Sequence, residues 1–192
     1  MSKGLSLYLL AITICISTAS ILLKPLIVVS EKQLNYQSVI MIDKAQLTYM
    51  IEKVTGDLGK ASPEATNLLL GTAAQESHLG TYFYQMGSGP ARGIFQIEPA
   101  TEKDIWENYL EYKPTLKANI IALTGVKSPN VNHLTMNILY QICIARVHYL
   151  RVKEALPTDL DDMAIYWKRY WNTKHGAGTE EEFKHNYARF LG

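Results

Sequence analysis

A chain of 192 residues, 47% of them apolar, is long enough to bury the core of one domain with an appendage. The first 30 residues hold two of the 19 basic side chains and none of the 18 acidic ones, so the remainder carries 17 basic and 18 acidic residues, a charge of −1. This near neutrality argues against a nucleic-acid-binding domain, which usually has a basic stripe. The two cysteines, Cys15 and Cys143, fit no zinc-site or disulfide-framework spacing, and we expect buried free thiols, with a regulated disulfide as the alternative.

The first predicted element is an apolar leader. Twenty uncharged residues run from Gly4 to Leu23 between Lys3 and Lys24, which is the length of a membrane span. Three interpretations stay open: an uncleaved signal anchor, including one able to leave the bilayer, a cleaved export signal, or a buried core helix. The first two place the rest of the chain outside the cytoplasm. We therefore divide the chain into a signal anchor or export signal (1–29), a tether (30–42) and a helical domain (43–192).

Helical signals are dense from Asp43 onward. Ser62-Pro63-Glu64 combines an N-cap, a proline at the first helical position and an acid in the first turn, and Thr179 with Glu182 can form a capping box. With the apolar spacing, such signals predict helices at about 44–58, 63–79, 99–109, 114–125, 130–152, 159–172 and 180–190. Residues 82–92 are expected to form a loop or short hairpin, and no stretch alternates convincingly as a strand. The predicted fold class is all-α, or α with a minimal hairpin.

Glu76 is the first candidate functional residue. The predicted 63–79 helix is almost uncharged and is therefore expected to be buried, with Glu76 in its last turn and Gly80 as its stop. Burial and the negative end of the helix dipole both raise the pKa of a carboxyl group. Such a group keeps a proton near neutral pH and can give it to the leaving oxygen of a glycosidic bond. The neighbouring Ser77 can bind this carboxyl group, a sugar or its own backbone.

The second candidate is the stretch Gly93-Ile94-Phe95-Gln96-Ile97. One glutamine between apolar residues is unusual for a bare core, because its amide must find hydrogen-bond partners. A groove wall that offers the amide and backbone groups to an acetamido sugar explains this pattern. A turn or strand of the core is the alternative.

Together these two motifs resemble the soluble lytic transglycosylase family of the lysozyme superfamily. The similarity rests on Glu76-Ser77 followed by Gly-Ile-Phe-Gln-Ile-Glu-Pro-Ala-Thr at 93–101, and it covers roughly residues 60–190. The stretch 170–179 is also similar to bacteriophage cell-wall lysis proteins that carry this domain. The resemblance implies a lysozyme-like fold in which Glu76 is the catalytic acid and Ser77 steadies the glycan or the acid. It further implies that Gln96 and Ile97 line the site for the N-acetyl group.

The chain departs from the family pattern at two positions. Trp171 stands where the family has a tyrosine, so the hydroxyl that steadies the acid is expected from Tyr170 or Tyr166, unless these rings form only a packing stripe. Glu98 replaces an apolar residue of the family. Goose-type lysozymes, which resemble this chain in Glu-Ser-His, carry an acid at the matching place. Glu98 is therefore either a second carboxylate for hydrolysis with inversion or the N-cap of the helix that begins at Pro99.

The expected function is that of a muramidase. It cuts the β-1,4 bond between N-acetylmuramic acid and N-acetylglucosamine in peptidoglycan, as a lytic transglycosylase that forms 1,6-anhydro products during bacteriophage-mediated lysis of the host. A hydrolytic goose-type-like lysozyme, a non-catalytic cell-wall-binding module of a virion or secretion apparatus, and a membrane-tethered scaffold are the alternatives. No metal or organic cofactor is required. The expected partners are glycan strands and, through the leader, the host inner membrane, but no nucleic acid. We expect a monomer that acts in the periplasm, either anchored or released.

Overall fold

Helices make up the ordered framework of residues 41–174 and 176–192, which are the residues that the computed structural model describes. No strand occurs in this part, where only two isolated bridges pair Arg92 with Tyr84 and with Ile97. The all-α prediction is confirmed. The helices are α2 (Lys44–Asp57), α3 (Pro63–Ser77), α4 (Pro99–Asn108), α5 (Pro114–Thr124), α6 (Val131–Met136), α7 (Ile138–Leu150), α8 (Leu160–Trp167) and α9 (Glu180–Leu191), with short turns η1 (Met86–Ser88), η2 (Leu110–Tyr112) and the π-helical η3 (Lys168–Asn172).

The predicted leader at 1–29 and all but the last two residues of the predicted tether lie outside the described residues. Within residues 41–174 and 176–192, none of the helices combines the length and the hydropathy that a membrane crossing needs.

Local capping explains where the helices begin. The Ser62 side chain accepts a hydrogen bond from Ala65 N at 3.1 Å, and Pro63 takes the first helical position. Thr179 and Glu182 form the reciprocal capping box that the sequence predicts. These starts are confirmed because each depends on a few neighbouring residues.

The end of α3 differs from the prediction. The helix stops at Ser77 rather than near Gly80, and three residues in a row then have positive φ: His78 at 52°, Leu79 at 53° and Gly80 at 85°. The Ser77 hydroxyl accepts a hydrogen bond from Gly80 N at 2.8 Å and donates one to Ile94 O at 2.6 Å. Both contacts draw the chain away from the helix axis directly after Glu76.

The single helix predicted at 130–152 is also wrong, because the chain breaks at Asn137. There φ and ψ are −102° and 95°, and the Asn137 side chain accepts a hydrogen bond from Tyr140 N at 3.1 Å. Asn137 therefore ends α6 and caps α7. The break leaves the carbonyl of Thr135 for Gln141, whose Nε2 donates to it at 2.9 Å.

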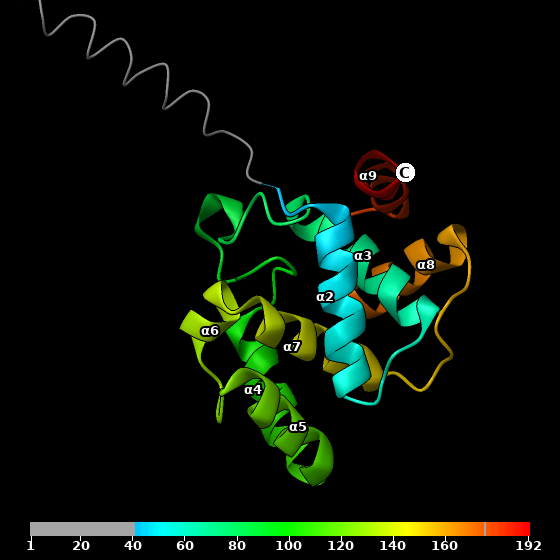
Figure 1. Ribbon diagram of the computed structural model, residues 1–192. Helices are drawn as coiled ribbons and strands as arrows, with labels where there is room; N and C mark the ends of the chain where they lie inside the picture. Colours follow the sequence, from blue (N-terminus) through cyan, green and yellow to red (C-terminus); the bar gives the residue numbers. More distant parts are fainter. Residues whose placement is uncertain (1–40, 175) are drawn as a thin grey trace, which may run out of the picture. The chain divides into compact units, whose positions relative to one another are not determined.

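The helices pack around α3 and α7, whose side chains are mostly buried. Figure 1 shows α2 lying across α3 and α7, with α8 and α9 on the side of α3 and α4 to α6 on the side of α7. At Gly71 a Cβ atom would lie 2.5 Å from Phe183 Cζ, so only glycine allows α9 to approach α3 this closely. This approach brings the C-terminal helix beside the end of α3 that carries Glu76.

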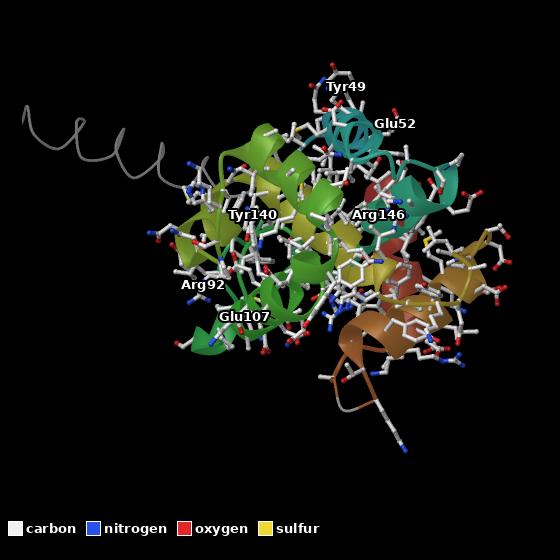
Figure 2. The ribbon with its side chains drawn as sticks, turned by 90° about the horizontal axis from the view of Figure 1, so that it is seen from below. Tyr49, Glu52, Arg92, Glu107, Tyr140 and Arg146 are labelled. Atoms are coloured by element: carbon white, nitrogen blue, oxygen red, sulfur yellow. The ribbon has the colours of Figure 1, made fainter. Side chains whose placement is uncertain are left out.

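A buried polar cluster joins α4 to α7. Tyr140 donates its hydroxyl proton to Glu102 Oε1 at 2.5 Å and accepts a hydrogen bond from Trp106 Nε1 at 2.7 Å. Asn130 N also donates to Glu102 Oε1, at 2.8 Å. In Figure 2 Tyr140 and Arg146 lie among the packed side chains of α7, whereas Tyr49 lies at the outer edge on α2. The cluster fixes the position of α4, which begins at Pro99, shortly after the turn at 93–97 that carries Gln96.

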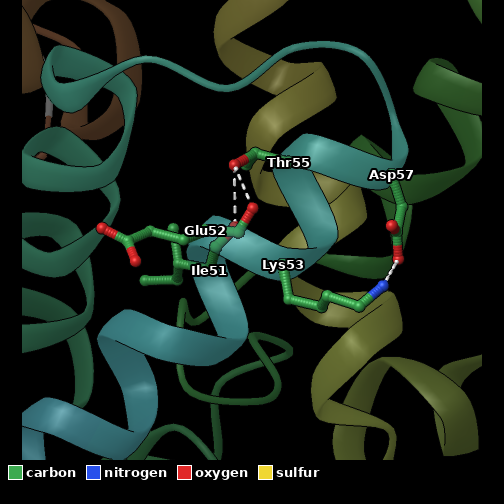
Figure 3. A network of polar contacts seen from close by, with 5 residues as sticks. All are labelled: Ile51, Glu52, Lys53, Thr55 and Asp57. Carbon is green, nitrogen blue, oxygen red and sulfur yellow. Dashed lines mark hydrogen bonds and ion pairs between the residues drawn. The ribbon is translucent and has the colours of Figure 1, made fainter.

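α2 is stabilised near its C-terminal end by its own side chains. Thr55 Oγ1 donates to Ile51 O at 2.8 Å, and Lys53 forms an ion pair with Asp57 one turn further on (Figure 3). Glu52 is exposed and its carboxylate points away from that pair (Figure 3). This end of the helix contributes no residue to the cavity described below.

Candidate active site

A cavity of about 630 Å³ lies where the end of α3, the segment 82–101 and the C-terminal residues 167–173 and 176–178 meet, with His148 of α7 also in its wall. We call it the groove. From α3 it receives Glu76 and Gln75, and from the other two segments it receives Tyr82, Gln85, Gln96, Ile97, Glu98, Trp167, Trp171, Asn172 and Gly178, among others. The groove therefore brings together four residues that the sequence singles out: Glu76, Gln96, Ile97 and Glu98.

Glu76 has the surroundings of an acid that is protonated near neutral pH. It sits in the last turn of α3, partly buried, and its Oε1 accepts a hydrogen bond from Trp167 Nε1 at 3.0 Å. Burial raises the pKa of Glu76 from 4.5 to about 7, and the hydrogen bond from Trp167 opposes part of that rise. A substantial fraction of Glu76 therefore carries a proton at pH 7, and the same group loses it readily.

Ser77 supports the site from behind and does not line the groove. Its side chain is fully buried, and its hydroxyl contacts the backbone of Ala73, Ile94 and Gly80. The expectation that Ser77 touches the glycan or the acid is corrected on this ground, because the backbone contacts already occupy the hydroxyl. What Ser77 does is join the end of α3 to the turn that carries Gln96.

The turn at 93–97 is held in a specific shape. Gly93 has φ 75°, and a Cβ atom there would lie 2.5 Å from both the Gln141 side chain and Leu134 O. Gln141, fully buried, accepts a hydrogen bond from Ile94 N at 2.7 Å. This contact with Gln141 attaches the turn to α7. Gln96 and Ile97 then face the groove, while Phe95 packs in the core.

Gln96 is oriented by its own turn. Its φ is 46°, and its Nε2 donates to Gly93 O at 2.8 Å and to Tyr82 O at 3.3 Å. Among the described residues, none donates a hydrogen bond to Gln96 Oε1, so this oxygen is left for an N–H group of a ligand. Ile97, which is buried, contributes apolar surface beside it.

Glu98 occupies the N-cap position of α4 but does not cap it with its side chain. Its backbone is extended, Pro99 follows as the first helical residue, and no capping hydrogen bond comes from the carboxylate. The side chain is exposed and lines the groove. The prediction that Glu98 is the N-cap of α4 is confirmed by its position, although its side chain makes no capping hydrogen bond and also lines the groove.

The two tyrosines predicted to steady the acid lie elsewhere. Tyr166 and Tyr170 contact each other edge-on at 4.7 Å and line a second depression, where the Tyr166 hydroxyl donates to Glu154 O at 3.4 Å. Neither lines the groove, so the predicted contact with the acid is wrong, and the alternative interpretation, a packing stripe of aromatic rings, agrees with the structure. On a helix the next residue points about 100° away, and that residue, Trp167, is the one that reaches Glu76.

Lys168 and His148, which the sequence interpretation missed, both help to shape the groove. The π-helical turn η3 follows α8 directly and brings Trp171 and Asn172 to the groove. Lys168 Nζ then donates to Asn172 Oδ1 and to the carbonyls of Gly176 and Gly178 at 2.6 to 2.9 Å. One ammonium group thus ties Asn172 of η3 to Gly176 and Gly178. A lysine before a glycine-rich stretch is a sequence signal, but only the fold shows what it binds.

His148 of α7 is the second missed group. Its Nε2 lies 2.8 Å from Tyr170 O in η3, its ring contacts Trp171 edge-on at 4.7 Å, and it lines the groove. Burial lowers the pKa of His148, which keeps the ring neutral near pH 7. His148 therefore joins α7 to the π-helical turn without adding a charge to the groove.

Comparison of the chain with protein-family models, with curated proteins and with solved structures gives no match. The functional interpretation therefore depends on the residues and their geometry.

Proposed function

We propose that this protein is a peptidoglycan-cleaving muramidase of the lysozyme-like fold, with Glu76 as its general acid and base. The observation that carries the proposal is a carboxyl group with a pKa of about 7 in a groove beside an oriented glutamine amide. The cleaved bond is the β-1,4 link between N-acetylmuramic acid and N-acetylglucosamine. The resemblance of the motifs at 76–77 and 93–101 to lytic transglycosylases supports this choice of substrate.

The proposed reaction uses Glu76 twice. First its proton passes to the bridging oxygen, the C1–O bond breaks towards that oxygen, and the acetamido carbonyl of the muramic residue supports the developing oxocarbenium ion. The Glu76 carboxylate then takes the proton of the muramic 6-hydroxyl, whose oxygen bonds to C1 and closes a 1,6-anhydro ring. A pKa near the working pH suits a group that must both give and accept a proton.

Binding of the N-acetyl group is assigned to the glutamine-bearing turn. Gln96 Oε1, which no described group donates to, can accept a hydrogen bond from an acetamido N–H. The apolar surface of Ile97 suits the acetyl methyl group. A polar group and an apolar group next to each other thus match the N–H and the methyl group of one acetamide.

The test is Glu76→Gln, which keeps the shape of the side chain and removes the proton donor. We expect loss of clearing in a turbidity assay on permeabilised Gram-negative cells, with glycan binding retained. Glu52→Gln, an exposed change on α2, is the matched control and should clear cells like the wild type. A Glu76→Gln variant that lyses cells at the wild-type rate would end the proposal. A wild type that binds cell wall but never clears it would favour the non-catalytic binding module.

Hydrolysis is the second candidate, and the position of Glu98 favours it. An exposed carboxylate that lines the groove and makes no capping hydrogen bond can activate a water molecule. Mass spectrometry of digested peptidoglycan separates the two reactions, because transglycosylation leaves anhydro ends and hydrolysis leaves reducing ends. Glu98→Ala should leave rate and product unchanged if transglycosylation operates, and should abolish reducing ends if Glu98 is the base.

The biological setting that we propose is host cell lysis by a bacteriophage. The leader would hold the enzyme at the host inner membrane with residues 43–192 in the periplasm, where its substrate lies, or would be lost on release. Fractionation of expressing cells, with the mass of the mature chain, distinguishes an anchored protein from a released one.

A further inference from the structure

The only side-chain hydrogen bond to Glu76 among the described residues comes from Trp167. The indole has little freedom to move. Trp167 is 1% exposed, its ring stacks on Phe183 of α9 at 5.3 Å with 29° between the planes, and a Cβ atom at Gly178 would lie 2.7 Å from its Cη2. The position of the N–H group is therefore set by α8, α9 and the segment after η3 together.

The chemistry of an indole makes this contact directional. An indole N–H donates and cannot accept, whereas a hydroxyl or a carboxamide can do both. Glu76 Oε1 faces this donor at 3.0 Å, so Oε1 must be the acceptor in both protonation states. A proton on the neutral acid is then favoured on Oε2, because the carbonyl oxygen of an acid accepts a hydrogen bond more strongly than its O–H oxygen does.

We propose that Trp167 is a positioning residue that fixes Oε1 of Glu76 and leaves Oε2 as the atom that exchanges the proton. The inference rests on the proposed function and assigns its two proton transfers to one atom. The Oε2–H bond breaks as the bridging oxygen takes the proton, and the C1–O electron pair stays with that oxygen. In the second step the muramic O6–H bond breaks, O6 bonds to C1, and the proton returns to Oε2. No rotation of the carboxyl group is needed between the steps.

The first experiment observes the contact without any activity measurement. The full chain contains three tryptophans, so a sample labelled with ¹⁵N-tryptophan gives at most three indole N–H signals. We expect the Trp167 signal to titrate with a midpoint near the Glu76 pKa of about 7 and this titration to vanish in Glu76→Gln. Trp106, whose N–H donates to Tyr140, is the internal control and should not follow Glu76. A Trp167 signal that is flat from pH 5 to 9 in the wild type would overturn the inference.

The second experiment follows kcat/KM against pH in Trp167→Phe, with Trp106→Phe as the matched control. Both changes remove a buried indole whose N–H is hydrogen-bonded. Loss of the Trp167 donor should move the high-pH limb upward by about 1 pH unit and lower the maximum by about tenfold or more. Trp106→Phe should leave the limb in place even where it lowers the melting temperature.

The outcomes separate the two proposals. If Glu76→Gln is inactive but the high-pH limb of the kcat/KM profile is unchanged in Trp167→Phe, the positioning role is wrong and the proposed function stands. If Glu76→Gln remains active, the proposed function fails, and with it the catalytic meaning of the contact. Should Trp167→Phe not fold, the titration of the indole signal in the wild type still decides.

Discussion

Removing the charge of Glu76 is expected to stabilise the folded protein, but only above about pH 4.5, where the unfolded chain has lost the proton of this carboxyl group. The pKa of Glu76 is raised from 4.5 to about 7 in the folded protein. Between these values the folded state holds a proton that the unfolded state has released, so stability falls as the pH rises. The penalty is absent below about pH 4.5 and complete above about pH 7, and it amounts to roughly 3 kcal/mol at 1.36 kcal/mol per pH unit.

Glu76→Gln removes this titration and keeps an oxygen that can accept the Trp167 hydrogen bond. Urea unfolding at pH 4, 6 and 8 should therefore show equal stability of wild type and variant at pH 4. At pH 8 the variant should be more stable by up to about 3 kcal/mol. Glu52→Gln, on the exposed face of α2 (Figure 3), should show no such growing difference. A difference for Glu76→Gln that stays constant with pH, or a wild type that is the more stable protein at pH 8, would refute the reasoning.

Three further changes test how the groove is built. Gly93→Ala should destabilise the fold by about 2–4 kcal/mol, because φ is positive and the new Cβ meets Gln141, whereas Gly56→Ala, with open space around it, should be neutral or slightly stabilising in the same urea assay. Gln141→Leu should cost about 3 kcal/mol in urea unfolding by leaving Ile94 N and a carbonyl of α6 unpaired. Lys168→Met should lower kcat/KM by about tenfold to a hundredfold, by loosening the segment after η3, with a much smaller change in melting temperature.

The sequence was sufficient for features that depend on a few adjacent residues. The starts of α3 and α9 follow from Ser62 and Thr179, and the all-α class follows from the density of such signals. The presence of Glu76 and Gln96 in one groove also agrees with the sequence, because each residue shows a local mismatch between a polar group and its apolar surroundings. Such mismatches are visible without a fold.

The features that escaped depend on partners far away in the chain. The break at Asn137 goes together with Gln141 reaching Thr135 and Ile94, the latter 47 residues away. The choice of Trp167 rather than a tyrosine as the partner of Glu76 depends on which face of α8 meets α3, 91 residues away. Periodicity fixes which residues share a helix face, but it does not tell which neighbour that face meets.

Backbone strain gives an argument for the groove that is independent of the carboxyl group. Within the described residues, the non-glycine residues with positive φ are His78, Leu79, Ser88, Gln96 and Thr173. Gln96 and Thr173 line the groove, the first two directly follow Glu76-Ser77, and Ser88 lies in the 82–92 segment that borders it.

Each such conformation costs about 1–3 kcal/mol and persists only where the surrounding contacts impose it. The contacts that impose it here are identifiable: the Ser77 hydroxyl after α3, the Gln96 amide in its own turn and the Lys168 ammonium after η3. A π-helical turn, another unfavourable element that recurs at functional sites, lies in the same region. The strained residues and the π-helical turn thus gather around the cavity that Glu76 lines, an arrangement typical of functional sites.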